Sequence, residues 1–531
     1  MNNQLMKNNI AILYLLPLVV LLFYVFWNSI SFPLHDFANS YFSAHVLARS
    51  DNQEAILFDI YEFNKYTWSL GYEEVLVDFY LNSPFTTVAF YPFVNIQDAY
   101  LAKIIFNVIG SLLFVLAVYA LLKRYGKNLS WFVVAIPFIF YVPIKNQILF
   151  GQSYFIIFAL IVFSFLWLER SKIAYGVCAL VLAIALKIFP LWYVIPLFFK
   201  KNWKAFLLVA IVGLTPLSIS VLFTGSVLWE TYFFEVIPNA IKNKSTVNFQ
   251  HNAQSLDVFL KTIFVKDIYY NPDALFNNEY LYIRIKWVLK SIIIGIAISL
   301  SFSNKNNLLS LLSIWIVTVF LLQSRTATYA QILWIIPAFH VISSTKKYKK
   351  VIVFLIILFL VCNLPISKLK ELPVLFQFSR LWLIIGLAIF FYYNFKIRIK
   401  YKYIGLCFIL LLPLHLDIFS KMKSDTSIYV LGKQKYFMIF DFTKDGHTLA
   451  YEALGKKGRE TIKTNINVTN FDEISCNIIN NQIELNGKQI TNDPSLKKKP
   501  ILINNSEVYY LTDSRSRRGA FTIKKIKINN P

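Results

Sequence analysis

The stretch AILYLLPLVVLLFYVFW, residues 11–27, contains no charged side chain and indicates the class of protein. With its neighbours it gives an apolar run over about residues 10–30, the length a helix needs to cross a bilayer. Similar runs recur along the first four-fifths of the chain, which is 57% apolar and only 15% charged. Soluble domains carry about 25% charged residues. We therefore expect an all-α polytopic membrane protein, in which the first run, lacking a small-residue cleavage site, is a retained anchor.

The distribution of charge predicts the orientation in the membrane. The formal net charge is +24, and short basic loops recur near residues 123, 169, 200, 304, 346 and 396. Such loops stay in the cytoplasm. The segment 31–98 is instead acidic, with nine Asp or Glu residues against two Lys or Arg. We expect it outside, together with a second large loop at 224–282.

The apolar runs and the loop charges predict about thirteen transmembrane helices, with the N-terminus in the cytoplasm and the C-terminus on the extracytoplasmic side. The heavy use of Asn, Lys, Ile and Phe is typical of an AT-rich bacterial genome, so we expect a bacterial inner membrane. The expected spans are near 10–30, 99–122, 129–145, 153–168, 173–188, 189–199, 205–223, 283–303, 308–322, 329–343, 351–364, 379–395 and 403–420. The 189–199 run is short for a full span and favours a half-helix or a tilted helix.

The last 111 residues, 421–531, are a different kind of sequence. Short β-type runs such as KYFMIFDF, TLAYEAL, ETIKTNINV and EVYYLT alternate with Asn-Gly and Asp-Gly steps, which are typical of hairpin turns. We therefore divide the chain into a transmembrane domain, 1–420, and a small extracytoplasmic β-domain, 421–531.

The sequence lacks the motifs of several common classes of catalytic and metal-binding site. No HExxH, GxSxG, nucleotide-binding loop or Cys-rich metal pattern occurs, and the four cysteines are scattered at Cys178, Cys362, Cys407 and Cys476. The basic residues lie mostly in loops, without a nucleic-acid-binding motif. We expect no metal, no cofactor and no nucleic-acid partner.

Asp36, in SFPLHDFANSYFSAH (residues 31–45), lies where the chain leaves the first predicted span. Aspartate is favoured as a helix N-cap, and the residues that follow are compatible with a helix. A carboxylate at a membrane surface could also act as a general base. Both interpretations stay open from the local sequence.

Other polar residues lie near the same predicted membrane face. Gln152, in KNQILFGQSYF (145–155), could bond across helices or hold a sugar hydroxyl. Lys187 lies between two apolar runs, where a lysine costs roughly 2.5–3.5 kcal/mol on insertion scales. It could extend to the interface or neutralise a lipid phosphate. Arg325, in QSRTATYAQILW (323–334), has the planar fork that suits phosphate.

The second outer loop carries NFQHNAQSLDVFL, residues 248–260. His251, Asn252 and Gln254 are candidates for binding a polar substrate. Ser255 is also a plausible start of a helix, and this structural alternative stays open.

Taken in order, these stretches resemble glycosyltransferase family 87. They are the aspartate of the first outer loop, the aromatic–proline patch DFYLNSPFTTVAFYPF (78–93), Gly151-Gln152, LKIFPLW with Lys187 and Pro190, Asn252-x-Gln254-Ser255, and the Ser-Arg-Thr patch before Tyr329. The similarity covers roughly residues 30–345. The resemblance implies a GT-C fold and a polyprenyl-phosphate sugar as donor, with Asp36 as the catalytic base.

One part of the chain departs from that family. Where members often carry histidines before a late span, this chain has SRTATYAQ, residues 324–331. We expect Lys187 and Arg325 to bind the donor phosphate instead, and Gln152, His251, Asn252, Gln254 and Tyr329 to bind substrate.

The sequence thus predicts an inverting hexosyltransferase that transfers a sugar, most simply mannose, to a lipid or glycan acceptor on the extracytoplasmic face. The alternative is a lipid or polymer transporter, or a non-catalytic envelope-assembly protein. A transporter would place polar groups near mid-bilayer in repeated halves. Here they gather at one predicted face, and the chain has no internal repeat.

Overall fold

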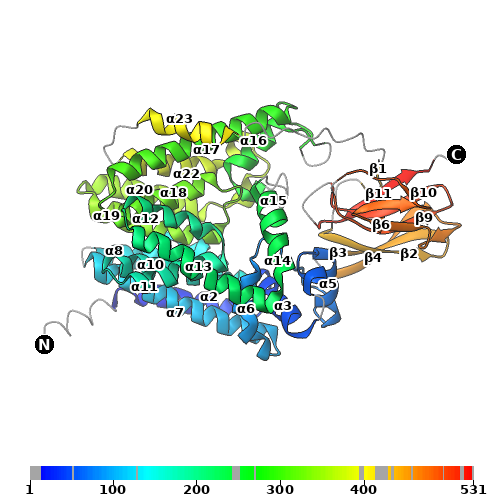
Figure 1. The fold of residues 1–531 in the computed structure, drawn as a ribbon, viewed down its shortest axis with the longest axis horizontal. Coiled ribbons are helices and arrows are strands. Elements are labelled where there is room, and N and C mark those ends of the chain that lie inside the picture. Colours follow the sequence, from blue (N-terminus) through cyan, green and yellow to red (C-terminus); the bar gives the residue numbers. More distant parts are fainter. Residues whose placement is uncertain are drawn as a thin grey trace.

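The computed structural model describes most of the chain, with a few short gaps. The described ranges are 13–50, 53–126, 129–241, 251–267, 271–393, 400–412, 428–431, 436–455, 458–493, 495–514 and 519–528. Helices occupy the part up to Leu410, and strands begin at Ile428. Figure 1 shows the helices gathered in one body and the strands in a second body beside it, next to α5.

The first helices form the N-terminal part and the predicted outer loop. They are α2 (Leu16–Ser29), α3 (Asp36–Arg49), α4 (Gln53–Leu57), α5 (Ile60–Ser69), α6 (Pro84–Phe90) and the 3₁₀ helix η1 (Tyr91–Asn95). The predicted loop 31–98 is therefore largely helical. Its apolar side chains, among them Phe37, Phe42 and Phe90, form one core with Trp229 and Tyr232.

The helical body continues through a long series of apolar helices. They are α7 (Ala99–Tyr125), α8 (Ser130–Ile139), α9 (Tyr141–Phe150), α10 (Tyr154–Glu169), α11 (Ile173–Leu186), η3 (Phe189–Val194), α12 (Ile195–Phe199), α13 (Trp203–Thr224), α14 (Ser226–Thr231), η4 (Tyr232–Val236) and α15 (Ile237–Ile241). After the next gap come η5 (His251–Ala253), α16 (Leu256–Phe264), α17 (Glu279–Ser303), α18 (Leu308–Leu322), η6 (Thr328–Trp334), α19 (Ile335–Ser344), α20 (Tyr348–Asn363), η7 (Ile366–Leu369), α21 (Val374–Gln377), α22 (Ser379–Tyr393) and α23 (Tyr401–Leu410).

This is a membrane protein. Among the described residues, α7, α13 and α17 are long and apolar enough to cross a bilayer, and α8 with α9, bent by 62°, would make a fourth span. Several other apolar helices are 10–17 residues long. The thirteen predicted spans are therefore not confirmed in number. Helix α18 is apolar and buried along nearly its whole length, which places it at the centre of the helical body.

The C-terminal part consists of short antiparallel strands. They are β1 (Ile428–Tyr429), β2 (Met438–Asp445), β3 (Thr448–Gly455), β4 (Gly458–Asn467), β5 (Phe471–Asp472), β6 (Cys476–Ile479), β7 (Gln482–Leu485), β8 (Lys488–Gln489), β9 (Lys497–Ile503), β10 (Glu507–Thr512) and β11 (Thr522–Lys527). They form a five-stranded sheet, β1-β11-β10-β9-β5, and two three-stranded sheets, β2-β3-β4 and β6-β7-β8.

The five-stranded sheet is covered on both faces. Along β10, Tyr509 and Leu511 point into a core shared with β2 and β3, whereas Val508 and Tyr510 point into a second core with β6 and β7. This alternation follows from the two-residue period of a strand. The predicted β-type tail is confirmed as a β-region.

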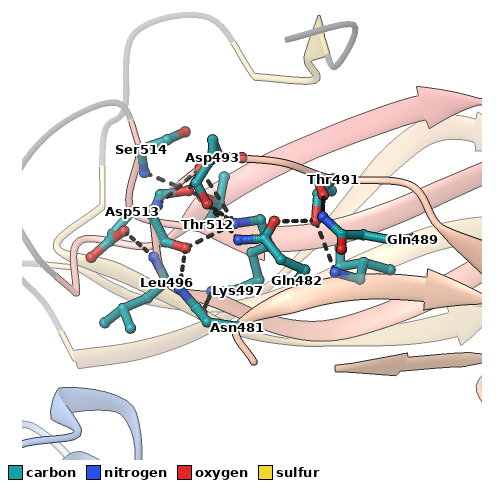
Figure 2. Close-up of polar contacts among 12 residues, drawn as sticks. Asn481, Gln482, Gln489, Thr491, Asp493, Leu496, Lys497, Thr512, Asp513 and Ser514 are labelled. Carbon is teal, nitrogen blue, oxygen red and sulfur yellow. Dashed lines mark hydrogen bonds and ion pairs between the residues drawn. The ribbon is translucent and has the colours of Figure 1, made fainter. Parts of the chain in front are cut away.

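A polar network fastens the segment between β8 and β9, as Figure 2 shows. The Lys497 ammonium is buried and donates to the carbonyl oxygens of Asp493 and Ser495, each at 2.9 Å. Asn481 donates to the Ser495 carbonyl at 2.7 Å and accepts from the Lys497 amide at 3.1 Å. These bonds give the buried Lys497 ammonium and the Asn481 side chain their hydrogen-bond partners.

The β-region docks on α5. Tyr61 donates a hydrogen bond to the Phe440 carbonyl at 2.6 Å, and Lys498 forms an ion pair with Asp59. The ring of Trp68 lies 3.9 Å from that of Phe440. Helix α5 thereby joins the β-region to the same segment that carries Asp36.

Candidate active site

Asp36 is the first residue of α3. The N-cap is His35, whose backbone adopts a left-handed φ of 51°, and no side chain caps the helix. The N-cap interpretation of Asp36 is therefore wrong. The carboxylate still lies at the positive end of the helix dipole, which favours its charged form.

Two side chains engage the carboxylate of Asp36. The Gln152 amide donates to Oδ2 at 2.5 Å, and Nδ1 of His35 lies 3.1 Å from Oδ1. The His35 ring stacks on Phe150, with ring centroids 4.0 Å apart. The Asp36 side chain keeps 30% of its surface exposed. It is thus held in one orientation and is still accessible to a substrate.

The surroundings of Asp36 keep it ionised. Burial raises the pKa of Asp36, but the hydrogen bond and charge of His35, the hydrogen bond from Gln152 and the charge of Lys187 together outweigh burial. The net effect lowers the pKa below its usual value. A carboxylate that stays ionised at neutral pH can accept a proton from an attacking hydroxyl.

Gly151 lets Gln152 reach Asp36. Helix α9 ends at Phe150, and Gly151 adopts the left-handed conformation with φ 64°. Its amide donates to the Ile148 carbonyl at 3.2 Å, as in a glycine-terminated helix. A Cβ at position 151 would lie 2.6 Å from Cβ of Phe37. The Gly-Gln step therefore packs against the Asp-Phe step, and Gln152 faces Asp36.

Two polar residues of α7, which no motif in the sequence singles out, support this arrangement. Lys103 is buried and donates to the carbonyls of Pro33 and Leu149, each at 2.6 Å. Asn107, one turn later, donates to the Ile148 carbonyl at 2.9 Å. Both tie the end of α9 in place, and Lys103 also holds the chain before α3. The signal available in the sequence was a Lys and an Asn four residues apart within an apolar run.

Lys187 lies near the same carboxylate. It is the residue after α11, is half-buried, and donates to Oδ1 of Asn82 at 3.4 Å. Ser83 donates to the Ala185 carbonyl at 2.5 Å, which fastens the start of α6 to the end of α11. The charges of Lys187 and Asp36 interact. It thus contacts the Asn82 side chain and lies within electrostatic range of a carboxylate, as expected for a lysine at the end of an apolar run.

Tyr329 and Arg325 complete this group. The Tyr329 ring packs against Tyr154, with ring centroids 5.2 Å apart, and edge-on against Phe150 at 6.3 Å. Tyr329 lies within electrostatic range of both Asp36 and Arg325. Arg325 is exposed. Five of the eight predicted site residues therefore gather in one region: Asp36, Gln152, Lys187, Arg325 and Tyr329.

The other three are engaged elsewhere. Nε2 of His251 and the amide of Gln254 both contact the Gln377 carbonyl, at 3.1 and 2.8 Å. Asn252, beside them, is exposed. Burial lowers the pKa of His251, and this effect outweighs the bond to Gln377, which favours the charged form. His251 and Gln254 thus anchor the start of α16 rather than contact Asp36.

This anchored turn also supports the segment that carries Arg325. Ser255 is the N-cap of α16, which confirms its predicted role as a helix start. Its hydroxyl also donates to the Ser324 carbonyl at 2.5 Å. Thr326 donates to the Ala253 carbonyl at 2.7 Å. Residues on both sides of Arg325 are therefore fixed to the 251–255 turn.

The described residues contain no group of three or more His, Cys, Asp or Glu side chains that could hold a metal ion.

The model of glycosyltransferase family 87 matches residues 80–324. This segment belongs to glycosyltransferase family 87. The resemblance found in the sequence is thereby confirmed, and the protein is a glycosyltransferase. The family 87 segment contains Gln152, Lys187 and the 251–255 turn, whereas Asp36 precedes it and Arg325 and Tyr329 follow it. No curated protein and no solved structure matches the chain.

Proposed function

We propose that this glycosyltransferase transfers a hexose, most simply mannose, from a polyprenyl phosphate to a lipid or glycan acceptor with inversion of configuration. The observation that supports this proposal best is the Asp36 carboxylate, oriented by Gln152 and His35 and within electrostatic range of the Lys187 ammonium. The family match supports sugar transfer, and the apolar helices fit a donor whose lipid stays in the bilayer.

Asp36 is the proposed general base. The acceptor oxygen attacks the anomeric carbon on the face opposite the phosphate, and its proton passes to the Asp36 carboxylate. The bond from the anomeric carbon to the phosphate oxygen breaks at the same time. Because the attack and the departure take place on opposite faces, the configuration at the anomeric carbon inverts.

Lys187 and Arg325 are the proposed phosphate-binding residues. The leaving polyprenyl phosphate gains negative charge as its bond to the sugar breaks, and a fixed cation lowers the energy of that state. Arg325 offers the planar pair of donors that suits a phosphate. Gln152 and Tyr329 would border the sugar, Asn252 is exposed for contact with substrate, and His251 and Gln254 would act by holding the Arg325 segment.

The proposed orientation places this site on the extracytoplasmic side of a bacterial inner membrane. We retain a GT-C fold with thirteen spans, a cytoplasmic N-terminus, and a division into a membrane domain (1–420) and an extracytoplasmic β-domain (421–531). The basic loops and the acidic segment 31–98 support this orientation. The family match favours this enzyme over the transporter or assembly protein.

The test compares the purified wild type with Asp36→Asn. Each is given radiolabelled polyprenyl-phosphate-mannose and a membrane lipid extract, and the transfer of label is followed. Loss of a general base lowers the rate by about 10²–10⁴-fold. Asp98→Asn is the matched control, because Asp98 belongs to the same acidic segment and caps α7, a role that asparagine also fills.

Each result has a separate meaning. If Asp36→Asn transfers label as fast as the wild type, the base is another residue. If the wild type transfers label only from a different lipid-linked sugar, mannose is wrong and the rest of the proposal stands. If the wild type accepts no lipid-linked sugar, the proposed donor class is wrong.

A further inference from the structure

The seam between α5 and the β-region contains a pocket of about 260 Å³ that the proposed reaction does not use. Three aromatic side chains line it: Tyr61 and Trp68 from α5, and Phe440 from β2. All three are almost fully buried, and the Tyr61 hydroxyl is fixed by its bond to the Phe440 carbonyl. The pocket therefore has a rigid aromatic floor.

Charged side chains of both signs surround this floor. Lys65 and Glu73 are exposed on the α5 side, and Asp441, Glu452 and Arg459 come from β2, β3 and β4. The Arg459 guanidinium lies 4.8 Å over the Trp68 ring and pairs with Glu452. Three carboxylates against two cations give the lining a formal charge of only −1, so neither an anion nor a cation is strongly favoured. A neutral ligand rich in hydroxyl groups can both donate to the carboxylates and accept from the cations.

The size of the pocket and one buried donor fit the same ligand class. Pockets for drug-sized ligands are about 300–1,000 Å³, so this one suits one or two sugar rings. Trp68 lines the pocket beneath Arg459, and its buried indole N–H has no acceptor among the described residues. A sugar oxygen at the edge of the Trp68 ring would give this N–H a partner, while Arg459 stays over the ring face and donates to a sugar hydroxyl group.

We propose that this pocket binds a neutral saccharide unit of the glycan acceptor, away from the reacting end. This inference rests on the proposed function, because it takes the acceptor to be a glycan. The pocket is well placed for the task, since α5 and α3 contribute Phe63 and Phe37 to one hydrophobic core. The acceptor would then be held at two points, in the pocket and at Asp36.

The test measures saccharide binding directly, without donor or transfer. The full-length protein in detergent is mixed with neutral di- and trisaccharides of mannose, glucose, galactose and N-acetylglucosamine, and saturation-transfer NMR detects binding. Inorganic phosphate and glucosamine serve as charged probes. We expect at least one neutral saccharide to bind the wild type, and neither charged probe to compete with it.

Two pairs of variants localise the binding. Arg459→Ala is compared with Lys463→Ala, since Lys463 lies on the same strand and is also ion-paired but does not line the pocket. Glu73→Gln is compared with Glu74→Gln, its exposed neighbour outside the pocket. We expect Arg459→Ala and Glu73→Gln to weaken binding by about tenfold or more, the effect of about one strong hydrogen bond. The two control variants should bind like the wild type.

The inference fails if no saccharide of the panel binds the wild type, or if Arg459→Ala and Glu73→Gln bind as tightly as their controls. It also fails if either charged probe displaces the saccharide. Asp36→Asn should keep full saccharide binding. A protein that binds saccharide but transfers no sugar would therefore contradict the proposed function and leave this site intact.

Discussion

Both carboxylate oxygens of Asp36 have a partner, Gln152 on one side and His35 on the other. An aspartate that rotated freely would seldom point its lone pairs at an acceptor hydroxyl. Here the orientation is set in advance by residues from two separate elements, which is the kind of preorganisation that catalysis by a single base requires. Gln152 is therefore a positioning residue for the proposed base.

The pH dependence of transfer should report this arrangement. Because the pKa of Asp36 is lowered, its protonation in the folded protein requires a pH below the usual aspartate value of about 3.9. We expect kcat/KM to stay level from neutral pH down to that range and to fall below it. The stabilisation that the carboxylate provides is present above the unfolded-state pKa and lost as the pH falls through the lower folded-state pKa.

Gln152→Leu tests the cause of this pKa. The hydrogen bond from Gln152 lowers the pKa of Asp36 and so opposes the effect of burial, which raises it. Without that bond the pKa of Asp36 should rise, and the acid limb of the rate profile should move to higher pH. Tryptophan fluorescence at each pH would show that the variant stays folded. An unchanged acid limb in Gln152→Leu would mean that Gln152 does not tune Asp36.

The site residues differ in how well the sequence alone could predict their roles. Asp36, Gln152 and Lys187 could be selected because polar groups next to apolar runs are costly unless they have a role. The N-cap interpretation failed because His35 takes a left-handed conformation, which residue type alone does not indicate. The partners of His251 and Gln254 could not be foreseen either, since the Gln377 carbonyl lies more than a hundred residues away.

Among the elements, the junction between α9 and α3 decides the geometry of the site. The end of α9 is held by Lys103 and Asn107 from α7, and its last turn presents Gly151 to Phe37. Three helices therefore meet around one glycine. A small change in this contact would shift Gln152 relative to Asp36.

Gly151→Ala should disturb this junction. Alanine is disfavoured at a φ of 64°, and its Cβ would lie 2.6 Å from Cβ of Phe37, which belongs to a buried side chain. We expect a loss of about 1–3 kcal/mol in the free energy of unfolding, and a fall in kcat without direct contact with substrate. Gly213→Ala is the control, because a Cβ there meets nothing within 4 Å in helix α13. Thermal unfolding and transfer assays measure both effects, and equal behaviour of the two variants would contradict this account.

Elements with strong local signals were predictable. The Asn486-Gly487 step forms the tight turn between β7 and β8 with positive φ at both residues, as that dipeptide favours. The sequence of strand β9, Lys497–Ile503, does not itself indicate a strand, because three lysines and a proline precede its three apolar residues. Tertiary contacts, including the burial of Lys497, make it a strand.

In the molecule as a whole, the β-region and the Asp36 segment meet through α5. At Gly519, a Cβ would lie 1.9 Å from Cγ2 of Ile60, the first residue of α5. This close approach leaves no room for a larger residue. Charge and apolar periodicity could predict a membrane protein with a β-type tail, but not this contact, because nothing in either segment alone specifies its partner.

Gly519→Ala should loosen the docking of the β-region. Its matched control is Gly446→Ala, since both glycines have positive φ but a Cβ at 446 meets nothing within 4 Å. In both variants an alanine is strained by a positive φ, so the two variants differ only in the clash with Ile60. We expect faster hydrogen–deuterium exchange of α5 in Gly519→Ala alone. Equal exchange in the two variants would mean that this contact does not hold the β-region on α5.

The docking on α5 has a consequence for acceptor length. Helices α3 and α5 share one core, so the aromatic pocket and Asp36 stand a fixed distance apart, and the enzyme would act as a molecular ruler. Glycans too short to bridge that distance bind at one point only and forgo the effective concentration that a second attachment provides. The rate of transfer should then rise abruptly once the acceptor is long enough to reach both sites. Arg459→Ala should abolish this dependence on length, because the pocket of that variant no longer holds the far end of the glycan.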